Sequence, residues 1–161
     1  MSDGDTDTPY AGAFSGREHR FALRVYFEDT DAAGIVYYAN YLKFMERARS
    51  DMLRAIGIDQ RGALDAGQGE YAGVYVVAEA QIKYRRPAKL EDALVIVSHL
   101  VGLGAASATI HQRVMRGEEM LADATIVAAF LSLDGRPKRQ PKAWLERFKP
   151  LLKGENEEFQ S

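Results

Sequence analysis

The sequence contains no cysteine among its 161 residues. Disulfides, thiolate metal sites, iron–sulfur clusters and a cysteine nucleophile are therefore excluded. Positive charge is not in excess either, because 21 Lys and Arg stand against 23 Asp and Glu, for a net charge of −2. Without a basic field, nucleic acid and an anionic membrane surface are not expected partners. Any chemistry must come from oxygen or nitrogen side chains, or from backbone amides.

Long hydrophobic runs are also missing. The longest strictly apolar run, Ile126 to Leu131, is far shorter than the roughly 20 residues that span a bilayer. The first 16 residues are rich in Asp, Thr, Ser and Gly and lack the basic start and apolar stretch of a signal peptide. The sequence therefore predicts a cytoplasmic protein.

The length predicts one compact domain, since a typical domain has about 150 residues. Apolar residues make up 47% of the chain, enough to bury a core, and 27% are charged. We expect a flexible N-terminal tail over residues 1–18, a single domain over 19–152, and a polar, mostly acidic C-terminal tail over 153–161.

Two periodic patterns open the domain. From Arg20 to Phe27, apolar residues at 21, 23, 25 and 27 alternate with the others, which predicts a strand with one buried face. From about Asn40 to Ile56, apolar residues recur every three or four positions between charged ones. This spacing predicts one long amphipathic helix, and Gly57 is a natural stop for it.

The rest of the chain is predicted to be mainly strand. Residues 59–73 have no clear period and indicate a loop with room for a short helix, and Lys142 to Leu151 favours a short terminal helix. Four β-rich segments lie between them: Val74 to Arg85, Ala93 to Val101, Ser107 to Arg116 and Met120 to Leu133.

A single long helix cannot cover both faces of such a sheet. The predicted fold is therefore α+β, with an antiparallel five-stranded sheet wrapped around one long central helix. The unbroken apolar run at 126–131 further suggests a strand that is buried on both faces, which favours an oligomer.

Several familiar signatures can be set aside. Gly102-Leu103-Gly104 imitates a phosphate-binding loop, but an alternating strand follows it and not a helix, so a hairpin turn is the better interpretation. His19, His99 and His111 are separated in the sequence from one another and from carboxylate pairs, so no metal site is predicted and a strand histidine is the simpler reading.

The informative segment runs from Phe27 to Tyr41. It places carboxylates just before a helix N-terminus, where unpaired amides and a partial positive charge favour a developing oxyanion. A carboxylate there can attack a carbonyl or activate water while the amides polarise the carbonyl oxygen. On spacing alone, capping of a turn or of the helix by Asp29 or Asp31 is the more common role.

This segment resembles the signature of the 4-hydroxybenzoyl-CoA thioesterase family of hotdog-fold proteins, and in particular its branch of Tol-Pal-associated acyl-CoA thioesterases. The matching residues are Val25-Tyr26-Phe27-Glu28-Asp29-Thr30-Asp31, Gly34-Ile35-Val36-Tyr37, Asn40-Tyr41, Glu46-Arg47-Ala48-Arg49, Tyr84, Pro87-Ala88 and Asp92. The similarity covers roughly Arg20 to Pro141, and the order of the predicted elements agrees with it.

The resemblance implies a hotdog fold and specific roles. Asp31 would be the catalytic carboxylate, acting either as nucleophile or as the group that directs a water. The backbone N–H of Tyr38 would hold the thioester oxygen, and the substrate would contact Gly34, Val36, Tyr37 and Asn40. No metal or bound cofactor is implied, and the partners would be the acyl-CoA substrate and further copies of the chain, as a homodimer or homotetramer.

The chain departs from the family pattern at two places. Many Tol-Pal-associated relatives carry His where this chain has Tyr38, so no imidazole is available at that position. Some relatives also place basic residues between the third and fourth strands to meet the CoA phosphates, and residues 101–107 contain none. Amides of Gly102 and Gly104, or the side chains of Arg85, Arg86 and Lys89, are possible substitutes, although a solvated strand end is the slightly favoured interpretation of those basic residues.

The first hypothesis is thus a thioesterase that hydrolyses an acyl-CoA to a free acid and CoA. The alternatives are a non-catalytic acyl-binding or scaffold protein for envelope or lipid-synthesis partners, and a hydrolase of acyl carrier protein thioesters. The roles of two sets of residues stay open. Tyr37, Tyr38, Tyr41 and Phe44 are either acyl-pocket or core residues, and Glu46, Arg47 and Arg49 are more typical of a helix surface or subunit interface than of a catalytic site.

Overall fold

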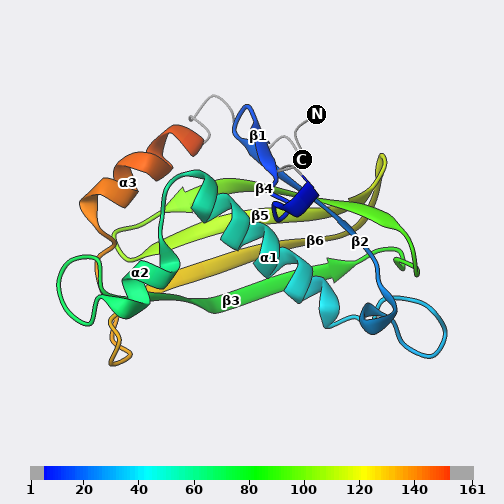
Figure 1. Cartoon of the computed structure of the whole chain (residues 1–161), viewed down its shortest axis with the longest axis horizontal. Helices are drawn as coiled ribbons and strands as arrows, with labels where there is room; N and C mark the ends of the chain where they lie inside the picture. Colours follow the sequence, from blue (N-terminus) through cyan, green and yellow to red (C-terminus); the bar gives the residue numbers. More distant parts are fainter. Residues whose placement is uncertain (1–5, 153–161) are drawn as a thin grey trace.

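The computed structural model describes residues 6–152 and contains a curved six-stranded sheet with helices on one face (Figure 1). The strand order is β1-β2-β4-β5-β6-β3, and every neighbouring pair is antiparallel. The strands are β1 (Ala13–Ser15), β2 (Glu18–Arg24), β3 (Val74–Tyr84), β4 (Ala93–Leu103), β5 (Ser107–Arg116) and β6 (Glu119–Leu131). The α+β class and the antiparallel sheet are thus confirmed, and the four predicted strands after residue 73 appear close to their predicted bounds.

The prediction of five strands is wrong because the sheet has a sixth strand, β1. It lies inside the segment expected to be a flexible tail over 1–18 and pairs with β2 through Ala13 opposite Arg20. Gly16, with φ of +62°, turns the chain between the two strands. A strand of three residues is too short to show alternation, which is why the pattern missed it. The tail predicted over 153–161 lies outside the described residues.

The prediction of one long central helix is also too simple. Helix α1 (Asn40–Ala55) has 16 residues, about 24 Å at 1.5 Å per residue, whereas the 13 residues of β6 extend over roughly 43 Å. One helix therefore covers only part of the sheet. The short helices α2 (Gln60–Asp65) and α3 (Lys142–Phe148) cover the remainder, followed by the 3₁₀ turn η3 (Lys149–Leu151).

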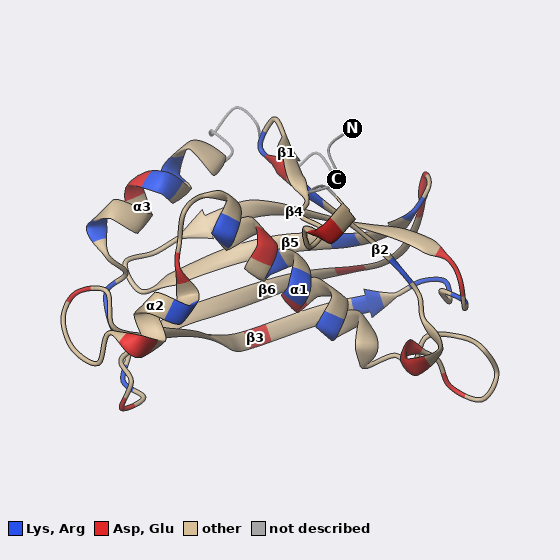
Figure 2. Cartoon of the chain, viewed as in Figure 1, with Lys and Arg blue, Asp and Glu red and all other residues tan. Residues whose placement is uncertain are grey.

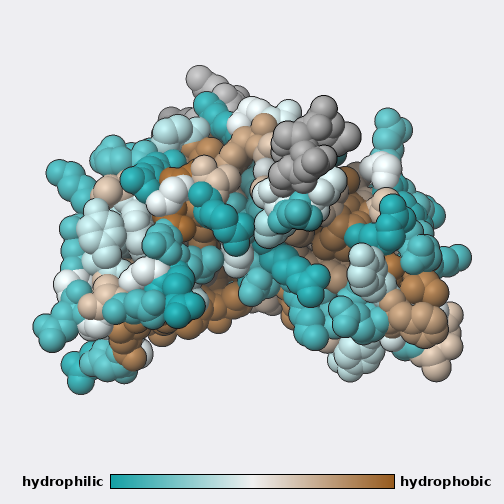
Figure 3. All heavy atoms as spheres, viewed as in Figure 1, coloured by the Kyte–Doolittle hydropathy of each residue, from teal (hydrophilic) through white to brown (hydrophobic). Residues whose placement is uncertain are grey.

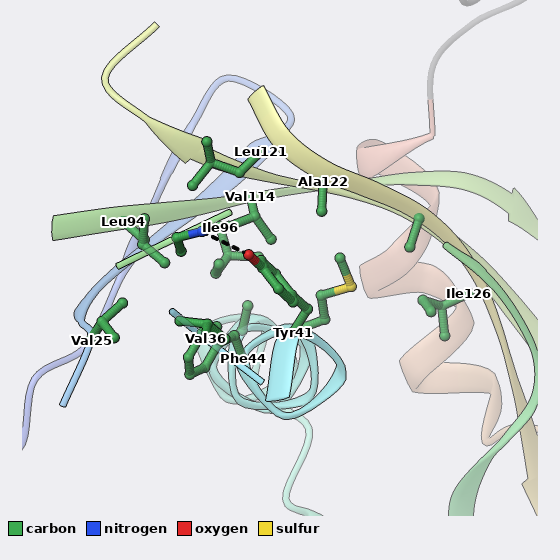
Figure 4. Packing of buried hydrophobic residues seen from close by; sticks show 14 residues of the cluster. Val25, Val36, Tyr41, Phe44, Leu94, Ile96, Val114, Leu121, Ala122 and Ile126 are labelled. Atoms are coloured by element: carbon green, nitrogen blue, oxygen red, sulfur yellow. Dashed lines mark hydrogen bonds between the residues drawn. The ribbon is translucent and has the colours of Figure 1, made fainter. Parts of the chain in front are cut away.

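Two clusters of buried side chains follow from this division. The first lies under the N-terminal half of α1, and Figure 4 shows the Tyr41 ring pointing from the helix toward the sheet among Val36, Ile96 and Val114. The second lies under the C-terminal end of α1 and under α2 and α3. It includes Met52, Ile58, Ala63, Leu100, Ile110, Phe130, Trp144 and Phe148.

The first predicted strand ends earlier than expected. β2 stops at Arg24, and Phe27 lies in the 3₁₀ turn η2 (Phe27–Asp29) with 77% of its surface exposed. The alternation of Phe21, Leu23 and Val25 is real, but the residues after Val25 leave the sheet to begin the loop toward α1. Phe27 is therefore a surface aromatic and not a core residue.

The edge strand β3 is unusually exposed for an apolar strand. Val76 and Val77 are 38% and 49% exposed, and hydrophobic atoms gather along the lower edge of the molecule in Figure 3, where β3 runs in Figure 1. The apolar run at 126–131 in the neighbouring strand β6 was expected to be buried on both faces. On the side that faces the helices, Ile126 and Phe130 are buried. On the other side Val127 is only partly buried. Within residues 6–152, no helix combines the length and apolar character needed to cross a membrane.

Candidate active site

The loop between β2 and α1 holds Asp31 in a fixed turn. Its Oδ1 accepts hydrogen bonds from the amide of Ala33 at 2.8 Å and from that of Ile35 at 3.4 Å, while its own amide donates to the Ile35 carbonyl at 2.9 Å. Aspartate favours such turns because its short side chain reaches the amides that follow it. Oδ2 accepts no hydrogen bond from the described residues, and the side chain is exposed. One carboxylate oxygen is thus anchored and the other is accessible.

Backbone contacts fix this loop against the neighbouring turn at residues 88–90. The Val36 amide donates to the Ala88 carbonyl at 2.8 Å, and the Leu90 amide donates to the Gly34 carbonyl at 3.0 Å. Gly34 has φ of +80°, a conformation that a residue with a Cβ rarely adopts. Val36, 4% exposed, anchors the loop in the core. Gly34 and Val36, predicted to contact substrate, therefore shape the loop.

The loop then leads into the N-terminus of α1. The Tyr37 amide and the Asn40 side-chain amide both donate to the Asp29 carbonyl, at 3.0 Å and 2.9 Å. The hydrogen bonds made by the described residues include none from the amide of Tyr38, which directly precedes the helix cap Ala39. Such free amides carry the positive end of the helix dipole. The loop therefore brings an accessible carboxylate oxygen and an amide without an acceptor to the same end of α1.

The aromatic residues of this region separate into two groups. Tyr41 and Phe44 are buried core residues, and the Tyr41 hydroxyl accepts a hydrogen bond from the Ala88 amide at 2.9 Å, drawn as the dashed line in Figure 4. Tyr37 and Tyr38 are 50% and 61% exposed, and their ring centroids lie 5.0 Å apart. Of the four aromatics considered for an acyl pocket, only these two face outward.

Tyr84, at the end of β3, completes the aromatic group. Its ring centroid lies 5.9 Å from that of Tyr38 and 5.4 Å from that of Tyr41, and both pairs are edge-to-face. Partial burial raises the pKa of the Tyr84 hydroxyl above its ordinary value, and the nearby Tyr38 and Tyr41 hydroxyls add to the shift. The sequence pattern gave Tyr84 only as part of the family resemblance. Its approach to Tyr38 depends on the tertiary fold, since 46 positions separate them.

The groups considered for phosphate contacts differ in whether they already form ion pairs or hydrogen bonds within the protein. Arg85 is paired with Asp123 at 2.8 Å and Arg86 with Glu119 at 3.1 Å. Lys89 is exposed and forms an isolated β-bridge through Ile35, directly beside the Asp31 loop. The amide of Gly104 is already bonded to the Ser107 carbonyl at 2.8 Å, because it closes the β4–β5 hairpin. Among these candidates, Lys89 is thus the exposed cation next to the loop.

The histidines are not isolated in space, contrary to their spacing in the sequence. His19 pairs with Asp51, and His99 lies directly opposite His111 across β4 and β5, with ring centroids 5.2 Å apart. Antiparallel pairing creates the second contact, which no local pattern reveals. None of the three lies in the segment from Asp31 to Asn40.

Comparison with known proteins places this geometry in a family. The model of the Thioesterase superfamily matches residues 33–122. The acyl-CoA thioesterase YbgC of Haemophilus influenzae is 38% identical over 129 residues, 80% of this chain and 90% of the relative. The acyl-CoA thioester hydrolase YbgC of Escherichia coli O6:H1 is 33% identical over 132 residues, 81% of this chain and 95% of the relative.

A solved structure agrees with these relatives. The crystal structure of a probable thioesterase from Bartonella henselae superposes with a TM-score of 0.73 at 36% identity, covering 77% of this chain and 99% of that one. The sheet wrapped around α1 is the hotdog fold. The chain belongs to the Thioesterase superfamily and is a thioester hydrolase by family. Within it, the chain is similar to the YbgC thioesterases, which confirms the branch indicated by the Asp31 segment.

Proposed function

We propose that this protein hydrolyses acyl-CoA thioesters to a free acid and CoA at the loop between β2 and α1, with Asp31 as the catalytic carboxylate. The proposal rests on the geometry of that carboxylate: Oδ1 is held by the Ala33 amide at 2.8 Å, while Oδ2 accepts no hydrogen bond from the described residues and the side chain is exposed. Holding one oxygen orients the other without tying down the side chain's reactive atom. The names of the two YbgC relatives support the substrate class.

The amide of Tyr38 is the proposed oxyanion donor. As the thioester carbonyl is attacked, negative charge grows on its oxygen, and an amide at a helix N-terminus stabilises that charge. Removal of one such donor typically lowers the rate by about 10²- to 10³-fold. Because the donor is a backbone group, a tyrosine serves at this position as well as the histidine of many relatives.

Two routes are consistent with this arrangement. In one, Asp31 Oδ2 attacks the carbonyl carbon, the C–S bond breaks to release CoA thiolate, and water then hydrolyses the resulting anhydride. In the other, the carboxylate accepts a proton from a water that attacks the carbonyl directly. Both give the same free acid and CoA. Incorporation of ¹⁸O from labelled water into Asp31 after turnover occurs only if water attacks the aspartyl carbonyl of the anhydride.

The CoA end of the substrate is proposed to meet Lys89. This side chain is exposed beside the Asp31 loop, whereas Arg85 and Arg86 already pair with Asp123 and Glu119. A single lysine attracts a phosphate as a point charge. Tyr37, Tyr38 and Asn40 are proposed to line the acyl side of the same loop, together with the ring of Tyr84.

A homodimer is proposed through the edge of β3. Val76 and Val77 are apolar and exposed there, and an unpaired strand edge offers backbone donors and acceptors to another strand. A second copy aligned on this edge would cover these side chains and extend the sheet. A pairing of dimers into a tetramer is the further form that the family resemblance implies.

The direct test is release of free thiol from purified protein with short, medium, long and aromatic acyl-CoAs. We expect turnover with at least one of the four classes, and the ranking defines the acyl preference. The same acyl groups carried on acyl carrier protein distinguish the two carriers. No turnover on either carrier would reject the hydrolase and leave the acyl-binding or scaffold alternative.

A further inference from the structure

The amide of Tyr38 can serve as an oxyanion donor only if its N–H points in a fixed direction. The preceding residue sets that direction, because a trans peptide is planar and its N–H lies opposite its C=O. The Tyr37 carbonyl accepts a hydrogen bond from the Asn40 amide at 2.8 Å, and the Tyr37 amide donates to the Asp29 carbonyl at 3.0 Å. Both ends of Tyr37 are thus held, and the Tyr38 N–H points away from the body of α1.

Asn40 adds a second contact to this arrangement through its half-buried side chain. Its Nδ2 donates to the Asp29 carbonyl at 2.9 Å, the same oxygen that receives the Tyr37 amide. A carbonyl oxygen has two lone pairs and accepts both donors. Since a carbonyl cannot donate, the part of the Asn40 side chain that faces it must be the NH₂ group. Asn40 therefore holds Tyr37 directly through its backbone amide and indirectly through the shared Asp29 carbonyl.

The Asp29 carbonyl is itself held in a fixed position. In the η2 turn, the Asp29 amide donates to the Tyr26 carbonyl at 3.0 Å, and Asp29 Oδ2 accepts the Tyr26 amide at 2.8 Å. The chain then pairs with itself as in a hairpin, because an isolated bridge joins Thr30 to Val36. Asp31 lies inside this pairing. The anchor for the start of α1 thus belongs to the same unit as the proposed catalytic carboxylate.

We propose that Asn40 is a positioning residue whose side-chain amide sets the place and direction of the Tyr38 N–H relative to Asp31. This inference rests on the proposed function and deepens it, since it names the group that aligns the oxyanion donor. Asn40 acts through the Asp29 carbonyl, which is separate from the contact with the acyl group proposed above. Because the oxyanion forms only as the thioester carbonyl is attacked, a misplaced amide weakens binding of the transition state more than binding of the substrate.

A purely structural role of Asn40 at the start of α1 predicts a different result for one substitution. A carboxylate at the first position of a helix is favoured by the helix dipole, so Asn40→Asp should preserve the thermal stability. An aspartate carboxylate cannot donate, however, and its oxygens repel the Asp29 carbonyl. If Asn40 only stabilised the helix, Asn40→Asp would keep full turnover. A positioning residue predicts loss of kcat in a variant that melts like the wild type.

The test compares kcat and KM for thiol release from the preferred acyl-CoA in the wild type, Asn40→Asp and Asn40→Ala. Both variants lack the donor, and Asn40→Ala adds no charge. We expect kcat to fall about 10- to 100-fold while KM changes by less than about threefold. A rise in KM at the wild-type kcat would overturn the proposal and leave Asn40 as a substrate contact. If Asn40→Ala does not fold, Asn40→Asp and its control decide.

The first turns of α1 offer a control with the same change of charge. Figure 2 shows acidic residues on η2 and on the loop that follows it, so a new carboxylate at position 40 adds to an acidic surrounding. Lys43→Gln makes the chain more negative by the same one unit, at an exposed side chain that takes no part in the link to Asp29. Its kcat should stay near the wild-type value. An equal loss in Lys43→Gln and Asn40→Asp would assign the effect to charge and overturn the proposal.

A second measurement does not depend on turnover. An acyl-CoA analogue with CH₂ in place of the thioester sulfur is a ketone that cannot be hydrolysed, and its ¹³C carbonyl signal moves to higher frequency when the oxygen accepts a hydrogen bond. We expect this shift on binding to the wild type and to Asp31→Asn, and a smaller shift on binding to Asn40→Ala. An equal shift in all three would overturn the positioning role. If the wild type releases no thiol but the shift still depends on Asn40, hydrolysis is rejected and the positioning role stands.

Discussion

The Nε2 of His19 lies 2.7 Å from Oδ2 of Asp51, and the two side chains are 0% and 4% exposed. The same carboxylate oxygen accepts the amide of Gly12 at 2.9 Å, and Oδ1 lies 3.3 Å from Arg54. His19 belongs to β2 and Asp51 to α1, so this pair ties the N-terminal strands to the helix. The rings of His19 and Phe14 of β1 also pack edge to face, with centroids 5.2 Å apart.

This pair predicts a loss of stability in mild acid. Burial holds the pKa of His19 below its ordinary value of 6.5, although Asp51 acts in the opposite direction. The unfolded chain therefore takes up the proton more readily, and the free energy of unfolding falls as the pH drops below about 6.5. Urea unfolding of the wild type and of His19→Gln between pH 7.5 and 5 measures this. The variant should show a weaker pH dependence, and equal slopes would exclude His19 as the source.

Removal of the Asp51 carboxylate should lower the free energy of unfolding more than removal of its exposed partner Arg54. Asp51→Ala leaves the His19 ring and the Gly12 amide without their acceptor in the core, and each unsatisfied buried group costs about 1–3 kcal/mol. Arg54→Ala removes a 71% exposed cation, for which about 0–1 kcal/mol is expected. Chemical denaturation at pH 7.5 compares the two. A similar loss of unfolding free energy in both variants would contradict the stabilising role of the His19–Asp51 pair.

The backbone role of Tyr38 predicts a contrast between two substitutions at one position. Tyr38→Ala keeps the amide, so the turnover number for a preferred acyl-CoA should change by less than about tenfold. Tyr38→Pro removes the N–H, and a fall of about 10²- to 10³-fold is expected. Circular dichroism confirms that both variants fold. A large loss in Tyr38→Ala would assign the function to the side chain instead.

The proposed dimer predicts that a charge on the β3 edge gives monomers. Val77→Lys alters a residue that is 49% exposed in the single chain, so folding should be retained while subunit contact is lost. Leu133→Lys is the control, because Leu133 is 44% exposed in the turn after β6. Sedimentation analysis should show a smaller species for Val77→Lys alone. An unchanged size would place the subunit contact elsewhere.

Local patterns predicted most of the fold because they report periodicity. The 3.6-residue spacing located α1 to within one residue at its C-terminal end, and β5 appears with the predicted bounds. The three-residue β1 carried no period and was missed. Phe27 continued the alternation by chance, because the chain leaves the sheet after Val25.

The residues of the candidate site could be predicted from the sequence for a different reason. Asp31, Gly34 and Tyr38 lie within eight positions of one another, so one local motif includes them. Contacts that join distant segments were not predictable in this way. The edge-to-face rings of Tyr38 and Tyr84 and the link from Gln112 to Arg49 depend on which strands and helices pack together.

The central claim is that the free oxygen of Asp31 performs the chemistry, and the most direct measurement is thiol release by Asp31→Asn on the preferred acyl-CoA. Asparagine keeps an oxygen for the Ala33 amide, so the loop should retain its shape while the charge is lost. Glu28→Gln removes a neighbouring exposed carboxylate as the matched control. We expect turnover to fall by at least about 10²-fold in Asp31→Asn and to stay near the wild-type value in Glu28→Gln. Thiol release by Asp31→Asn at the wild-type rate would contradict it.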